Sequence, residues 1–110
     1  MKMKDCINEL DIKLLNTATL EKEVEDVYIG DLLSMVMAKA NENSLWLTVQ
    51  AHMNTIAIAE MLDISGGVIF LEGVIPNEDV IKKADELNLL LMSSQQSAYS
   101  LSKKLVSLGI

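Results

Sequence analysis

The sequence predicts a single α/β domain in which a mainly parallel β-sheet is flanked by helices. The main observation is a pattern repeated three times, a short continuous apolar run followed by a polar turn and a stretch with helical spacing. The runs are residues 45–49, 68–71 and 89–92. They are too short for helices and too uniformly apolar for half-exposed strands, which is typical of buried parallel strands. The length of 110 residues, half of them hydrophobic, fits one packed domain spanning 1–110.

Each of these predicted strands is followed by a predicted helix with its own start signal. The signals are Asn54 as a cap, the segment 76–79 with its proline and acids, and Ser94 or Ser97. Apolar residues then recur every three or four positions, and the helices stop before Gly66-Gly67 and at Gly109. The second half therefore predicts the order β-α-β-α-β-α.

The first half of the chain has a less regular pattern. It indicates a short helix over 3–9, a strand over 12–15, an acidic segment over 21–26 and a strand over 27–29. Asp31 is then expected to open a helix with five inward-facing apolar residues. These are Leu32, Leu33, Val36, Met37 and Ala40.

Charge and composition exclude several classes of function. Nine lysines and no arginine face sixteen acids, for a net charge of −7, which argues against a nucleic-acid surface. Without arginine, an anion site has to use backbone amides, helix N-termini or lysine. No apolar stretch approaches the roughly 20 residues that cross a bilayer, and no signal region follows the first residues. We expect a cytoplasmic protein with no membrane partner, and a buried thiol at Cys6.

A candidate binding site lies where the parallel strands end. Right-handed crossovers gather the loops after each strand along one edge of the sheet, where ligands of open α/β sheets bind. The candidate ligand-binding residues at this edge are Asp31, Gln50, His52, Asn54, Glu72, Gly73, Ser94 and Gln95. Their amides and hydroxyls suit orientation of a small ligand or contact with another chain, although polar loop ends also commonly satisfy the backbone.

A catalytic interpretation pairs His52, the only histidine, with Asp31 or Glu72 as a general acid-base couple. The alternative is a histidine that bonds a backbone group or a partner subunit. No metal-ligand spacing occurs, and Gly66-Gly67 precedes a strand, so it predicts a turn and not a phosphate-binding loop. The sequence specifies no cofactor.

Four methionines and the single tryptophan are relevant to whether the chain forms a homodimer. Met35, Met37, Met53 and Met61 lie on two predicted helices, where core filling is the default and an adaptable contact surface the alternative. Trp46 marks core or an interface. A small domain with such helices is expected to form a homodimer.

Three segments of the chain have a pattern known from other sequences. They are Gly30-Asp31-Leu32-Leu33-Ser34, Val49-Gln50-Ala51-His52-Met53-Asn54 and Leu71-Glu72-Gly73 with the following Pro76. Through these segments, residues 30–105 resemble the DRTGG domain family. Ala51-His52 stands where the family has Asp-Arg, and Leu71-Glu72-Gly73 where it has Thr-Gly-Gly. The family is similar to the N-terminal regulatory region of HPr kinase/phosphorylase and also occurs as an accessory domain in some CBS-containing pyrophosphatases.

The resemblance implies a fold like that N-terminal region and a role in regulation. It is greatest to short stand-alone members, some of which sit beside iron-hydrogenase and redox-signalling proteins, so a partner of that kind is expected. The first hypothesis is therefore a non-enzymatic regulatory or interaction module, a homodimer that binds a small ligand or a protein at the strand ends. The alternatives are an enzyme or enzyme subunit that uses His52, and an assembly protein that only docks.

Overall fold

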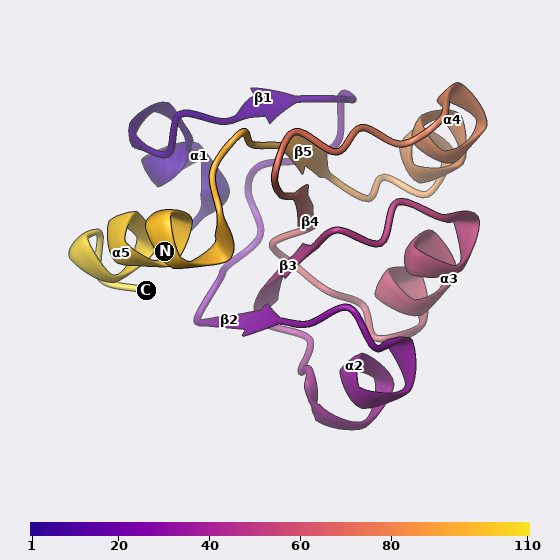
Figure 1. Ribbon diagram of the computed structural model, residues 1–110, viewed down its shortest axis with the longest axis horizontal. Coiled ribbons are helices and arrows are strands. Elements are labelled where there is room, and N and C mark those ends of the chain that lie inside the picture. Colours follow the sequence, from indigo (N-terminus) through magenta and orange to yellow (C-terminus); the bar gives the residue numbers. More distant parts are fainter.

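The protein, described over residues 1–110 by a computed structural model, consists of three layers with the sheet in the middle (Figure 1). The helices α2 (Leu33–Lys39), α3 (Met53–Met61) and α4 (Glu78–Glu86) cover one face of the sheet. The other face is covered by α1 (Met3–Cys6), which continues into a 3-10 turn over Ile7–Glu9, and by α5 (Ala98–Ser107). The longest helix, α5, has ten residues, so no helix reaches the length and apolarity that a bilayer span requires.

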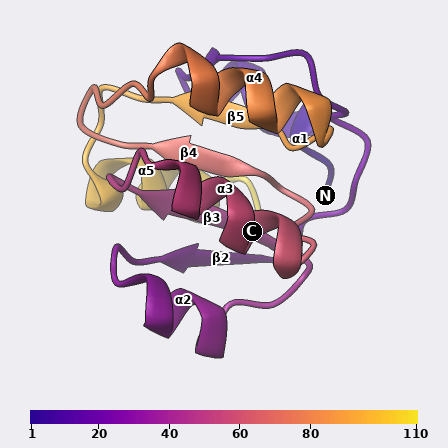
Figure 2. The same ribbon diagram turned by 90° about the vertical axis from the view of Figure 1, so that its right-hand side faces the viewer.

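The sheet has five strands in the order β1-β5-β4-β3-β2. They are β1 (Lys13–Leu14), β2 (Asp26–Ile29), β3 (Ser44–Thr48), β4 (Val68–Phe70) and β5 (Leu91–Ser93). The strands β2 to β5 run parallel, as the arrows in Figure 2 show, and only β1 is antiparallel, with Lys13 opposite Ser93. This arrangement confirms the predicted α/β class and the predicted β-α-β-α-β-α order of the second half.

Both faces of the central strands are buried, as the uniformly apolar runs predict. All five residues of β3 are buried, including Trp46, whose indole N–H donates a hydrogen bond to the Gly30 carbonyl at 2.9 Å. Two clusters of twelve buried residues lie on the two faces, one under α1 and α5 and one under α2, α3 and α4. Trp46 is thus a core residue and anchors the end of β2.

The third apolar run is not entirely a strand, because β5 begins at Leu91 and extends to Ser93. The Leu89 N–H donates to the Ala84 carbonyl and so closes the last turn of α4. Of Leu89 and Leu90, only Leu90 bonds to β4, because its carbonyl accepts from the Val68 N–H. The apolar character of Leu89 reflects packing under the end of α4 and not strand pairing.

The prediction for α2 is partly wrong. Val36 is buried as predicted, but Leu32 precedes the helix and is 64 % exposed, and Met37 is 47 % exposed. Because this seven-residue helix lies over the edge of the sheet, only one narrow side of it meets the core (Figure 2). Met35, Met53 and Met61 are exposed as well, so core filling, the default interpretation of these methionines, is wrong.

The two edges of the sheet differ. The strand β1 covers β5, while β2 pairs only with β3. The Asp26 N–H donates to Asn43, just before β3, and the Gly30 N–H donates to Leu47 in β3, so the N–H groups of Val27 and Ile29 face away from the sheet. The Asp26 carboxylate accepts a hydrogen bond from the Val27 N–H at 2.8 Å, which leaves that outward donor satisfied within its own strand.

The single cysteine is part of the core between α1 and the sheet. Cys6 is buried, and its thiol donates a hydrogen bond to the Met3 carbonyl at 3.6 Å. Burial raises the pKa of the Cys6 thiol above its ordinary value, and the nearby Asp5 carboxylate raises it further. The predicted buried thiol is confirmed.

Gly67 is expected to be essential for folding. Its φ is +80°, and an added Cβ would lie 2.3 Å from the Leu90 carbonyl oxygen. Gly67→Ala is therefore expected to lower the free energy of unfolding by about 3 kcal/mol, from left-handed strain and overpacking together. The matched control is Gly109→Ala, at φ +96° with open space around it, which should cost only about 1 kcal/mol. Urea unfolding measures both, and equal losses would contradict the prediction.

Candidate functional site

The loops that follow β2, β3, β4 and β5 lie along one edge of the sheet, at the left of Figure 2, and we call it the carboxyl edge. Neighbouring loops are tied to one another by hydrogen bonds. The Leu71 N–H, just after β4, donates to the Thr48 carbonyl at the end of β3. The predicted site residues therefore lie at one edge of the sheet, because they follow parallel strands. Their contacts show that they have different roles.

Asp31 holds two loops together and does not open a helix as predicted. Its carboxylate accepts hydrogen bonds from the Thr48 hydroxyl and from the Val49 N–H, both at 2.8 Å. The helix α2 begins two residues later, at Leu33. Since both bonds fix the backbone at the end of β3, Asp31 is a structural anchor of the carboxyl edge.

The loop after β3 presents polar side chains that have no partner within the chain. The backbone of Gln50 is fixed, because its carbonyl accepts from the Thr55 hydroxyl at 2.6 Å, while its side-chain amide makes no hydrogen bond. His52, and not Asn54, is the N-cap of α3, so the predicted Asn54 cap is wrong and Asn54 lies in the first turn. The side chains of His52 and Asn54 are exposed and make no hydrogen bond.

The proposed acid-base couple is not assembled. His52 forms neither a hydrogen bond nor an ion pair with Asp31 or Glu72. The Asp31 carboxylate is committed to Thr48 and Val49 instead. The chain has no cluster of three His, Cys, Asp or Glu side chains with the geometry of a metal site.

The loop after β4 is a tight turn at Glu72 and Gly73. The Val74 N–H donates to the Leu71 carbonyl at 3.0 Å, and the φ angles of Glu72 and Gly73 are +58° and +76°. Two consecutive left-handed residues define a type I′ turn, which favours glycine at both positions. Glu72 adopts the first of these positions at a cost in strain and presents an exposed carboxylate.

The loop after β5 is bonded to this turn. The Glu72 N–H donates to the Gln96 carbonyl, and the Gly73 N–H donates to the Ser94 carbonyl at 2.8 Å. Ser94 is buried, and its hydroxyl accepts from the Gln96 backbone N–H. The Gln96 amide also donates to the Leu10 carbonyl at 2.8 Å, so Gln96 fixes the loop whereas Gln95 is exposed.

The β2 and β3 side of the carboxyl edge also carries exposed apolar side chains. Leu32 and Met35 lie at the start of α2, Val49 follows β3, and Met53 opens α3. These four residues, which we call the apolar row, are all at least 40 % exposed. Large exposed apolar side chains that share an edge with unpaired polar ones are suited to protein contact.

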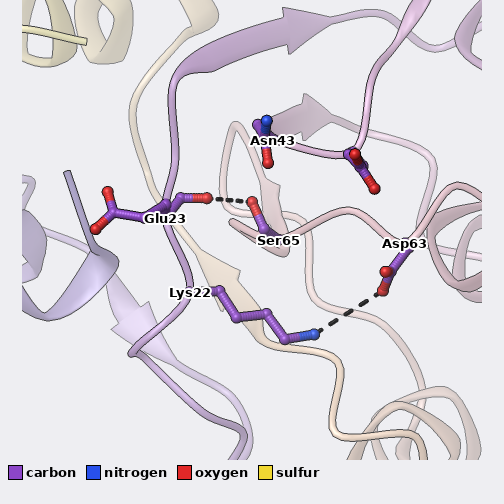
Figure 3. Close-up of a pocket in the computed structure, with 6 residues that line it drawn as sticks. Lys22, Glu23, Asn43, Asp63 and Ser65 are labelled. Carbon is purple, nitrogen blue, oxygen red and sulfur yellow. Dashed lines mark hydrogen bonds and ion pairs between the residues drawn. The ribbon is translucent and has the colours of Figure 1, made fainter.

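A polar hollow of about 240 Å³ lies at the opposite edge, among residues that precede β2, β3 and β4 (Figure 3). It is lined by Lys22, Glu23, Glu42, Asn43, Asp63 and Ser65. The Ser65 hydroxyl donates to the Glu23 carbonyl, and the Lys22 ammonium lies 4.0 Å from the Asp63 carboxylate. Both interactions tie chain segments together, which gives this hollow a structural role.

Substitution of Asp31 is expected to lower the free energy of unfolding far more than substitution of His52. Asp31→Ala removes the acceptor of two hydrogen bonds, one from a backbone N–H, and should lower the free energy of unfolding by about 2 kcal/mol. His52→Ala, with no partner to lose, should change it by less than about 0.5 kcal/mol. Urea unfolding of both variants makes the comparison. A large loss for His52→Ala would indicate a structural role for the imidazole.

Comparisons with known proteins support the fold. No family model matches the sequence, and no curated protein matches it. Among solved structures, the fold is similar to that of the CBS and DRTGG domains of the regulatory region of Clostridium perfringens pyrophosphatase, complexed with the activator diadenosine tetraphosphate. The TM-score is 0.72 at 14 % identity, over 94 % of this chain and 45 % of that one, so this chain spans less than half of its neighbour. The likeness shows a DRTGG-like α/β fold.

Proposed function

We propose that this chain is a non-enzymatic regulatory module that acts by binding a protein partner at its carboxyl edge. The apolar row of Leu32, Met35, Val49 and Met53 is the observation that carries the proposal. The side chains of Gln50, His52 and Asn54 stand beside it without partners in the chain, free to bond a partner's polar groups. The DRTGG-like fold, which occurs in a pyrophosphatase regulatory region, supports a regulatory role.

A binding role fits the state of the titratable groups better than catalysis does. General acid-base chemistry needs groups held within hydrogen-bond reach of one another or of a substrate. Asp31 is occupied by structural bonds, and His52 is exposed with nothing to orient its imidazole. Substrate chemistry would also need a cleft beside His52, and none of the hollows in this structure is lined by it.

The effector of this chain is expected to differ in chemistry from diadenosine tetraphosphate. That activator is a polyphosphate, and a tetraphosphate bridge demands concentrated positive charge. This chain has no arginine and a net charge of −7, and Glu72 adds a carboxylate to the carboxyl edge. A protein surface with matching apolar side chains suits the edge better. A redox-signalling or hydrogenase-related protein of the cytoplasm is the partner class that the family resemblance suggests.

Cross-linking from the carboxyl edge tests the docking proposal. A photo-reactive amino acid at Met53 should cross-link to one specific protein in extracts of the source cells, because Met53 lies in the proposed interface. The same group at Val106, which is exposed on α5, is the matched control and should not. With the identified protein purified, Met53→Lys should weaken binding roughly tenfold or more by calorimetry, as loss of an interface anchor does. Equal capture from both positions would contradict the proposal.

We further propose that the module is a homodimer that pairs through the outer sides of α2 and α3, where Met37 and Met61 are exposed. Sedimentation equilibrium at micromolar concentration should give twice the 12.1 kDa chain mass. Met61→Lys should shift the mass to that of the monomer, because it places a charge in an apolar contact, whereas Val106→Lys should not. A monomeric mass for the unmodified chain would rule out this assembly.

A further inference from the structure

A second hollow lies at the carboxyl edge, at the corner formed by the paired strands β1 and β5. Its volume is about 320 Å³, near the lower limit of pockets that hold small molecules. It is lined by Asp11, Ile12, Lys13, Ile75, Ser93, Ser94 and Gln95. The residues come from three segments distant in sequence, and none belongs to the apolar row.

Ser93 places an unsatisfied hydroxyl in this hollow. The residue is only 7 % exposed, and its hydroxyl makes no hydrogen bond. Every fully buried side-chain nitrogen and oxygen in the protein has a partner, so the Ser93 oxygen has to retain access to solvent. Ser93 lines the hollow and stands directly opposite Lys13 in the sheet, which puts both side chains on the same face. The Ser93 hydroxyl therefore reaches solvent through this hollow.

Two opposite charges on the rim are free of internal partners. Lys13 is exposed and forms no ion pair. Asp11, two residues earlier, is exposed as well and makes no ion pair or side-chain hydrogen bond. The Asp11 carboxylate and the Lys13 ammonium do not form an ion pair with each other. Each is therefore available to a ligand group of opposite charge.

The remaining lining supplies an amide and an apolar surface. The Gln95 side chain is exposed and lies over Gly73, where an added Cβ would come within 2.8 Å of its amide oxygen. Ile75 is 52 % exposed, so it offers apolar surface beside the charges. The hollow therefore combines one cation, one anion, a serine hydroxyl without a partner in the chain, an amide and an aliphatic side chain in a small volume.

We propose that this hollow binds a small zwitterion with an aliphatic side chain, of the size and chemistry of a free branched-chain amino acid. Lys13 and the Ser93 hydroxyl bind the carboxylate, Asp11 binds the ammonium group, and Ile75 contacts the aliphatic part. A zwitterion uses both rim charges and adds no net charge to an acidic chain, whereas a simple acid or amine leaves one rim charge unpaired.

An NMR titration of the full chain with three matched probes tests the proposal. L-Leucine should shift the backbone amide signals of Ser93, Ser94 and Gln95 and saturate with a Kd of about 1 mM or lower. The probes 4-methylpentanoate and 3-methylbutylamine lack the ammonium and the carboxylate respectively. Each should bind roughly tenfold or more weakly, since each leaves a charge of the site unpaired.

Substitutions assign the binding to this hollow. Ser93→Ala and Lys13→Gln should each weaken L-leucine binding roughly tenfold, while Lys39→Gln, an equal charge change on α2, should leave it unchanged. The dispersed spectrum of each variant reports that it is folded. The proposal is overturned if L-leucine causes no saturable shift at about 10 mM, if all three probes bind equally, or if Ser93→Ala and Lys13→Gln bind like the unmodified chain. These outcomes are independent of the docking proposal, whose residues lie outside the hollow.

Discussion

Burial of the central strands on both faces is the constraint on which the rest of the structure depends. The strands β3, β4 and β5 are buried throughout, because a cluster of twelve residues packs against each side of the sheet. Such burial is typical of parallel strands joined by helical crossovers, and parallel pairing brings the ends of β2 to β5 to the same edge. Polar side chains therefore lie in the loops at the two ends of the strands, and the loops that follow β2 to β5 meet at the carboxyl edge.

Much of this fold could be predicted from the sequence, since continuous apolar runs report two-sided burial directly. The differences arise where one residue serves two elements. Leu89 continues an apolar run but closes the last turn of α4, so its hydrophobicity marks the core without marking a strand. The exposed methionines are apolar residues outside the core. Helical spacing predicts which residues share one face of a helix, but it does not predict how much of that face the sheet covers.

The sequence could predict where the candidate residues lie but not what their side chains contact. The strand-end rule puts Asp31, His52 and Glu72 at one edge, yet only contacts show that Asp31 is an anchor and His52 a free side chain. Ser93 could not be singled out by pattern, because a serine at the end of an apolar run suggests a loop residue. Ser93 matters because the antiparallel strand β1 places Lys13 directly opposite it. The local sequence does not indicate that β1 pairs with β5.

The bond between the Asp26 carboxylate and the Val27 N–H has a consequence for how copies of the protein can meet. An incoming strand that approaches β2 would find this outward donor already occupied and a negative charge beside it. Because two copies would bring two such carboxylates together, growth of the sheet into an aggregate is disfavoured from this side. The other side ends in β1, which has only two residues and runs against its neighbour. Edge-to-edge association of this acidic chain is therefore disfavoured. Its contacts with other proteins are then made mainly by side chains.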